Sequence, residues 1–265
     1  MKARANGIEV NYELSGREGG PAVVLHHPLA TTLAIWDELT AALAPRYRVL
    51  RFDARGHGHT EAPAGPYSFE TLAADVVALM DAVGMGRALY LGLSMGGMVG
   101  QYLGLLNADR FQCLILVSTS SRVPPEMGST WDARIAAARA DGMKSQVPDA
   151  LARWVSPEAR RSNPALVARL SRMIENTPVE GYIGWGQAIK ELNVTDRLPA
   201  IRLPTRVIVG ELDPATPVAG AETIHKQIPG SELIIMPGVS HMLCAEAPDA
   251  FHGHVIPFLD RVAQA

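Results

Sequence analysis

The first half of the chain alternates short apolar runs with longer segments of helical spacing. The apolar runs have the length of buried strands and lie at residues 22–26, 47–52, 88–91 and 113–117. Segments with apolar positions every three or four residues follow at 33–43, 69–83 and 95–107. Residues 8–14 alternate apolar and polar positions, which is typical of a half-exposed strand. This succession predicts βαβ units around a mainly parallel sheet.

The pattern changes after residue 120. Up to about residue 196 no strand-like run occurs, and short helices are predicted at 131–140, 147–155, 164–176 and 179–190. Strand-like runs return at 205–209 and 232–236, and a last helix is predicted at about 248–262. We therefore expect one α/β core built from residues 1–120 and 197–265, with residues 121–196 as an inserted helical cap.

A short glycine-rich sequence stands between one predicted strand and the helix that follows it. Residues 92–97 read Gly-Leu-Ser-Met-Gly-Gly, which contains the pattern G-x-S-x-G. A serine on a sharp turn from strand to helix is lifted out of the sheet, and flanking glycines allow the strand and the helix to approach each other closely. The pattern predicts that Ser94 is a nucleophile.

A serine hydroxyl needs a base, and two loops after predicted strands supply the candidates. In open α/β sheets ligands bind beyond the carboxyl ends of the strands. Asp213 follows the run at 205–209, and His241 follows the run at 232–236. His241 is expected to take the serine proton, with Asp213 to orient its ring. Glu211 is the rival carboxylate, and we favour Asp213 because it lies deeper in the loop.

The developing negative charge on a substrate oxygen requires two backbone N–H donors. One is expected from Met95, the residue after the nucleophile, and the other from the loop at 26–30. Leu29 is the candidate in that loop, because Pro28 has no N–H group.

The order Ser, Asp, His is that of the α/β-hydrolases, and the chain resembles this superfamily. More narrowly it resembles the 3-oxoadipate enol-lactonases. The matching positions of the core are Leu29 with Trp36, residues 53–58, residues 92–101 and residues 213–217. Those of the predicted cap are residues 131–135, 142–143, 153–154 and 181–182.

The resemblance implies an eight-stranded, mainly parallel sheet flanked by helices, and hydrolysis of a small carboxylated enol-lactone without a cofactor. Ser94 would open the lactone to an acyl-enzyme, which water then hydrolyses. Arg134, beside Trp131, is a candidate to bind the substrate carboxylate, although a solvated arginine is the alternative. Trp185 stands where the enol-lactonases carry a small residue and is expected to reshape the pocket. His27-Pro28 is a second departure from the family pattern, where His-Gly is common.

Composition and charge narrow the choice of partner. The 265 residues are 48% hydrophobic and 19% charged, and the formal net charge is −3. We expect a small-molecule substrate and no nucleic-acid or membrane partner, because no basic cluster and no apolar run of about 18 residues occurs. No secretory signal is recognisable, so a cytoplasmic monomer or homodimer is expected. Cys113 and Cys244 lie in apolar stretches and are expected to be buried and unpaired.

Several alternatives keep the same residues. A broader carboxylesterase, an acyl-homoserine-lactone lactonase, a carbon–carbon bond hydrolase or a perhydrolase-like enzyme would use the same three side chains. A hydrolase-fold receptor with slow turnover belongs to a different class. His57 and His59, with His26 and His27, resemble metal ligands, but the run 57–62 lacks the final histidine of metal-dependent lactonases. No metal is therefore expected.

Overall fold

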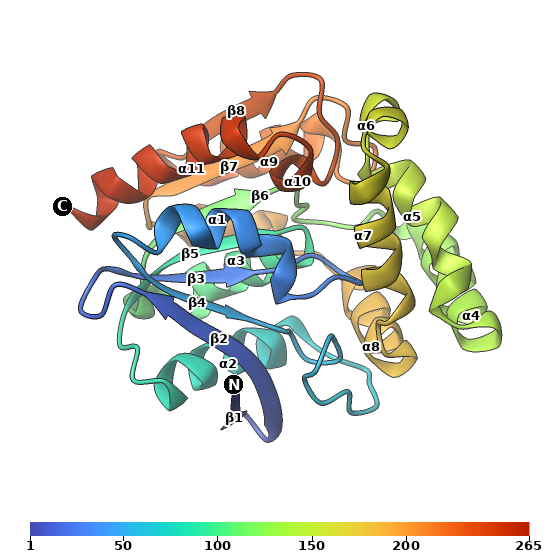
Figure 1. The fold of residues 1–265 in the computed structure, drawn as a ribbon, viewed down its shortest axis with the longest axis horizontal. Coiled ribbons are helices and arrows are strands. Elements are labelled where there is room, and N and C mark those ends of the chain that lie inside the picture. The colour runs from blue at the N-terminus through green and yellow to red at the C-terminus, as the bar shows by residue number, and fades with distance from the viewer. Residues whose placement is uncertain (265) are drawn as a thin grey trace.

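An eight-stranded sheet forms the centre of the structure, a computed structural model that describes residues 1–264 (Figure 1). The strands are β1 (Lys2–Ala5), β2 (Ile8–Gly16), β3 (Ala22–His26), β4 (Arg48–Phe52), β5 (Ala88–Leu93), β6 (Phe111–Val117), β7 (Thr205–Gly210) and β8 (Glu232–Met236). Their order across the sheet is β1-β2-β4-β3-β5-β6-β7-β8. β1 and β2 pair antiparallel, as do β2 and β4, and the remaining pairs are parallel. The predicted fold class is confirmed.

Helices cover both faces of this sheet. On one face lie α1 (Asp37–Leu43), which follows the 3-10 turn Leu33–Trp36, and α11 (Pro248–Ala263). On the other lie α2 (Phe69–Ala82), α3 (Met95–Leu106) and α9 (Val218–Gln227). Every residue of β5 is buried, because helices pack on both sides of it. This explains the continuous apolar runs of the parallel strands.

Between β6 and β7 the chain forms a helical cap over the carboxyl ends of the strands (Figure 1). Its helices are α4 (Gly128–Asp141), α5 (Val147–Trp154), α6 (Pro157–Ser162), α7 (Pro164–Glu175) and α8 (Val179–Lys190). In α7, Leu166, Leu170 and Ile174 recur every four residues and bury one face. Each such buried side chain contributes about 1.5–3 kcal/mol of hydrophobic stabilisation.

Hydrogen bonds attach the cap to the core at several points. The backbone N–H of Met242 donates to the carbonyl of Trp154 at 2.9 Å, and the N–H of Ser156 donates to the Glu246 carboxylate at 3.1 Å. The Arg169 guanidinium donates to the carbonyl of Ala34. These contacts join α5 and α7 to the core, with the cap lying above the strand ends.

Some elements were not anticipated from the sequence pattern. β1 was missed because Lys2 and Arg4 are charged, yet the strand pairs with β2 through a turn in which Asn6 and Gly7 have positive φ. α6 and α9 were missed because their sequences are short and polar on most sides. α10 (Leu243–Glu246) is a single turn that follows His241. Within residues 1–264 no helix combines the length and apolar character needed to cross a membrane.

Candidate active site

Ser94 occupies a sharp turn from β5 into α3. Its φ of 56° and ψ of −113° are unusual for a residue with a side chain. The conformation is held by the Ser94 N–H, which donates to the carbonyl of Val117 at 2.8 Å, and by the Thr119 hydroxyl, which donates to the Ser94 carbonyl at 2.8 Å. A Cβ at Gly92 would lie 2.2 Å from the carbonyl oxygen of Gly96, so only glycine fits at that position.

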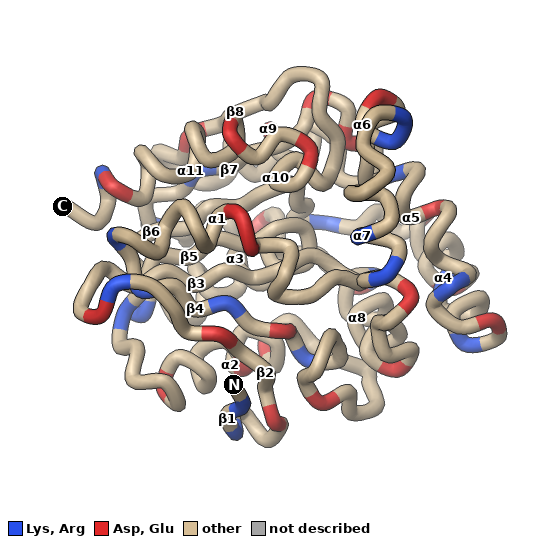
Figure 2. Tube along the Cα trace, in the orientation of Figure 1, with Lys and Arg blue, Asp and Glu red and all other residues tan. Residues whose placement is uncertain are grey.

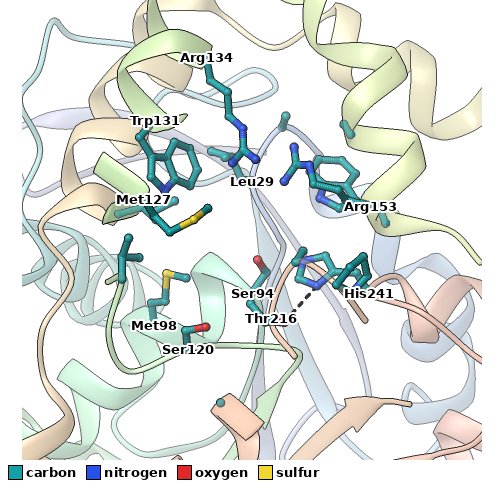
Figure 3. A pocket seen from close by; sticks show the side chains of 18 of the residues that line it. Leu29, Ser94, Met98, Ser120, Met127, Trp131, Arg134, Arg153, Thr216 and His241 are labelled. Carbon is teal, nitrogen blue, oxygen red and sulfur yellow. Dashed lines mark hydrogen bonds between the residues drawn. The ribbon is translucent and has the colours of Figure 1, made fainter. Parts of the chain in front are cut away.

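A cavity of about 430 Å³ lies between Ser94 and the cap (Figure 3). Ser94 and His241 line the floor of this cavity, and cap residues line its roof. The apolar part of the wall includes Leu29, Ala30, Met98, Val123, Met127, Ala150, Ile174 and Ile189. A cavity of this size suits a small organic molecule.

His241 and Asp213 form a buried pair behind Ser94. The Nδ1 atom of His241 lies 2.8 Å from Oδ2 of Asp213, and the Thr216 hydroxyl donates to the same oxygen at 2.7 Å. Oδ1 of Asp213 accepts the backbone N–H groups of Ala215 and Thr216. Burial raises the pKa of Asp213, but the His241 charge and these hydrogen bonds outweigh burial and lower it overall. The carboxylate is therefore ionised and directed at the imidazole.

Glu211, the alternative to Asp213 as the acid, does not contact His241. Its carboxylate accepts the backbone N–H of Gly238 at 2.9 Å, and the residue is exposed. The structure thus places Asp213, not Glu211, against His241.

The two candidate oxyanion donors lie on adjacent segments. Leu29 lines the cavity after β3, and Met95 is the first residue of α3, where helix N–H groups have no intrahelical partner. Within residues 1–264, neither backbone N–H donates a hydrogen bond. Both N–H groups therefore remain candidates for an oxyanion hole.

Arginines of the cap enter the cavity opposite Ser94. Arg134 comes from α4 and Arg153 from α5, and Figure 3 shows their guanidinium groups directed toward each other above Ser94. The Arg134 guanidinium also lies 5.1 Å from the ring centroid of Trp131, which lines the same cavity. Burial, and then the charge of Arg134, lower the pKa of Arg153. Acidic and basic residues are spread over the rest of the chain (Figure 2), but none of the described residues that line the cavity is acidic.

Sequence reasoning had not assigned Arg153 and Trp154 to the site. Trp154 stacks on the His241 ring with the two centroids 6.3 Å apart. The spacing of Arg134 and Arg153 carries no local motif, since they lie on two helices joined by a 3-10 turn. The one available signal was that both belong to the cap positions shared with the enol-lactonases.

Trp185 does not line the cavity, which corrects the expectation that it shapes the pocket. Its side chain is fully buried, and its indole N–H donates to the carbonyl of Arg55 at 2.7 Å. The ring packs edge-on against Phe69, His26 and His57. Trp185 joins α8 to the core because the small residues around it in α8 allow close packing.

Two of the histidines considered as metal ligands, His27 and His57, instead accept backbone N–H groups. Nε2 of His27 accepts the backbone N–H of Ala54, and Nε2 of His57 accepts that of Ala30, each at 2.9 Å. His59 is exposed. No group of three potential metal ligands occurs within residues 1–264. Cys113 and Cys244 are buried and free, and burial raises the pKa of each thiol to about 12.

Comparison with known proteins identifies the family of the chain. The model of the alpha/beta hydrolase fold family matches residues 21–248. 3-Oxoadipate enol-lactonase 2 of Acinetobacter baylyi is 32% identical over 97% of this chain and 95% of its own length. The crystal structure of the enol-lactonase from Burkholderia xenovorans is 36% identical, with a TM-score of 0.94 over 98% of this chain and 100% of that chain.

A third relative is an esterase. The malate-bound thermophilic esterase from Thermogutta terrifontis is 27% identical, with a TM-score of 0.94 and 99% of both chains covered. The resemblance stated from the sequence is thereby confirmed, and the chain belongs to the alpha/beta hydrolase fold family.

Proposed function

We propose that this protein hydrolyses a small carboxylated ester or lactone, with Ser94 as the nucleophile. The observation that carries the proposal is the convergence of Ser94 and His241 with Arg134 and Arg153 on one cavity. The first pair supplies a nucleophile and its base, and the second pair supplies a site for an anion.

The first half of the proposed reaction forms an acyl-enzyme. Ser94 Oγ attacks the carbonyl carbon while its proton passes to Nε2 of His241, and Asp213 stabilises the resulting imidazolium. The N–H groups of Leu29 and Met95 bind the negative oxygen, each contributing about 3 kcal/mol to transition-state stabilisation. The bond from carbonyl carbon to leaving oxygen then breaks, and His241 returns its proton to that oxygen. In a lactone the leaving oxygen stays within the same acyl group.

The second half releases the acid. A water molecule gives a proton to His241 as its oxygen attacks the acyl carbon. The bond to Ser94 Oγ breaks, the proton returns to Ser94, and a carboxylic acid leaves. The overall change is the addition of one water molecule across the ester bond.

The arginines support a carboxylated substrate. A carboxylate between Arg134 and Arg153 would relieve the repulsion of two like charges and accept charge-assisted hydrogen bonds. Two of the relatives are named enol-lactonases, and 3-oxoadipate enol-lactone is a small carboxylated lactone. We propose this compound or a close analogue as the substrate.

A broader carboxylesterase is the second candidate. The apolar wall formed by Met98, Ile174 and Ile189 would accept an uncharged acyl or aryl group. The Thermogutta terrifontis relative is an esterase, which favours this alternative. The two candidates differ in whether the rate depends on a carboxylate.

The test compares wild type with S94A on p-nitrophenyl acetate and on 3-oxoadipate enol-lactone formed from muconolactone. We expect turnover of both substrates, a much higher kcat/KM for the enol-lactone, and loss of both activities in S94A. Equal rates on the two substrates would favour the broader carboxylesterase. Activity that persists in S94A would refute the nucleophile assignment, and a wild-type protein without turnover would point to a receptor.

A further inference from the structure

Two buried histidines join the loop that carries Leu29 to the loop after β4. His27, on the first loop, accepts the N–H of Ala54 on the second, with 2.9 Å between the nitrogen atoms. His57, on the second loop, accepts the N–H of Ala30 on the first, also at 2.9 Å. Both rings are fully buried, and their centroids lie 5.1 Å apart. The two hydrogen bonds therefore form a reciprocal link between the loops.

The partners of each ring determine where its proton lies. Nδ1 of His27 faces the carbonyl of Pro28 at 2.8 Å, and Nδ1 of His57 faces the carbonyl of Arg55 at 3.2 Å. A carbonyl only accepts, so each Nδ1 carries the hydrogen and each Nε2 keeps the lone pair that accepts the backbone N–H. Both imidazoles are neutral in this arrangement. Burial lowers the pKa of His57 to about 3 and also lowers that of His27.

The same hydrogen bonds fix the two peptide groups beside Leu29. The Pro28 carbonyl accepts from His27 Nδ1 and from the Thr31 hydroxyl at 2.7 Å. In a planar trans peptide the N–H points opposite to the carbonyl, so these donors turn the Leu29 N–H away from themselves. The next peptide is fixed by the bond from Ala30 N–H to His57. The Leu29 N–H therefore points away from these donors, and no acceptor for it occurs within residues 1–264.

The backbone conformation of Ala30 also needs the hydrogen bond to His57. Its φ is 54°, a left-handed conformation that costs an alanine roughly 1–2 kcal/mol. Such a conformation persists only where the surroundings enforce it. The hydrogen bond to His57 does so, and Trp185 holds the His57 loop in turn through the carbonyl of Arg55.

We propose that His27 and His57 are positioning residues that orient the Leu29 N–H toward the negative oxygen of the transition state. The proposal rests on the function proposed above, because acyl transfer through Ser94 is what makes use of that N–H group. Neither histidine touches the substrate. Loss of one oxyanion donor lowers kcat by roughly 100- to 1000-fold, so a donor that is merely misdirected should cost roughly 10- to 100-fold.

The test compares H57L with H57Q. Leucine removes the acceptor for Ala30 N–H, whereas the glutamine side-chain oxygen can replace Nε2. Active sites are counted by end-point labelling of Ser94 with a fluorophosphonate, so misfolded protein does not enter the rate. We expect kcat per labelled site to fall roughly 10- to 100-fold in H57L with KM within about threefold of wild type, and most of the loss to be restored in H57Q. H59L, a change at an exposed histidine of the same loop, should match wild type.

Two results would overturn the proposal. One is an unchanged kcat per labelled site in H57L, and the other is an equal loss of kcat in H57Q and H57L. Should H57L fail to fold, nitrogen-15 NMR of the wild-type imidazoles at pH 7 decides the matter. Neutral rings with hydrogen on Nδ1 support the proposal, and hydrogen on Nε2 of His57 refutes it.

The NMR result is independent of activity and separates the two proposals. A wild-type protein without any esterase or lactonase turnover refutes the proposed function while the proton positions on His27 and His57 are still measured. Turnover that depends on Ser94 but not on an acceptor at position 57 refutes only the positioning role.

Discussion

Arg134 and Arg153 direct their guanidinium groups into one cavity from two different helices, and within residues 1–264 neither forms an ion pair with a carboxylate. Burial and the neighbouring Arg134 charge disfavour the charged form of Arg153. Arginine nevertheless stays charged in proteins. A bound carboxylate would compensate two positive charges at once.

Replacing Arg153 by glutamine should therefore weaken the use of carboxylated substrates. We expect R153Q to lower kcat/KM for 3-oxoadipate enol-lactone by about 10- to 100-fold, the loss of one or two charge-assisted hydrogen bonds. The rate on neutral p-nitrophenyl acetate should change less than threefold. R139Q alters an exposed arginine of α4 outside the cavity and serves as the control. Equal losses on both substrates would contradict a carboxylate-binding role.

The two carboxylates of the loop after β7 should differ sharply in their effect on the rate. D213N keeps the shape of the side chain but favours the wrong tautomer of His241, and we expect kcat to fall by about 10⁴. E211Q should stay within about twofold of wild type, because Glu211 contacts Gly238 and not His241. Steady-state kinetics of the two variants on one ester provides the comparison. A large loss in E211Q would mean that the assignment of the acid is wrong.

Much of this fold was predictable because the decisive signals are local. The turn around Ser94 combines a glycine requirement with a switch from strand to helix, and both are visible in six consecutive residues. Asp213 and His241 follow strands whose ends must meet at one edge of a parallel sheet. The positions of these residues therefore followed from topology.

The positions of the Trp185 and Arg153 side chains could not be predicted from the neighbouring sequence. Both lie on cap helices, and the direction in which each helix turns its side chains depends on packing between segments distant in sequence. Trp185 points into the core, where its ring is fully buried and its N–H reaches the carbonyl of Arg55 at 2.7 Å. Arg153 reaches the cavity because α5 is held to the loop after His241. Neither contact leaves a periodic signal in the chain.

Trp185 is expected to act on stability and Trp131 on substrate binding. W185A removes a fully buried indole and should lower the free energy of unfolding by about 3–5 kcal/mol. W185F keeps most of the packing but loses the N–H donated to Arg55, at a cost of about 1 kcal/mol. W131A removes a ring that is only partly buried, so it should lower the free energy of unfolding less than W185A does, and it should raise KM. Urea denaturation together with kinetics tests this, and a raised KM at unchanged stability in W185F would restore a substrate contact for Trp185.

The buried histidines should make the protein sensitive to mild acid. Burial lowers the pKa of His26, His27 and His57 below the ordinary value of 6.5, and that of His57 reaches about 3. Below pH 6.5 the unfolded chain binds protons that the folded chain does not, so stability is complete above pH 6.5 and is lost as the pH falls toward 3. Asp213, with its lowered pKa, loses its stabilising contribution only below about pH 4.

Each of these imidazoles contributes at most about 1.4 kcal/mol per pH unit to the slope of the free energy of unfolding against pH. Urea denaturation between pH 5 and pH 7 measures that slope. The unfolded chain of H57Q binds one proton fewer than the unfolded wild type, because glutamine does not titrate. The slope should therefore fall by as much as about 1.4 kcal/mol per pH unit. H59Q changes an exposed histidine of the same loop and should leave the slope as it is in wild type. If stability depended on pH identically in H57Q and wild type, His57 would bind a proton equally well in the folded and unfolded states. The assignment of a neutral His57 ring that accepts the Ala30 N–H would then be wrong.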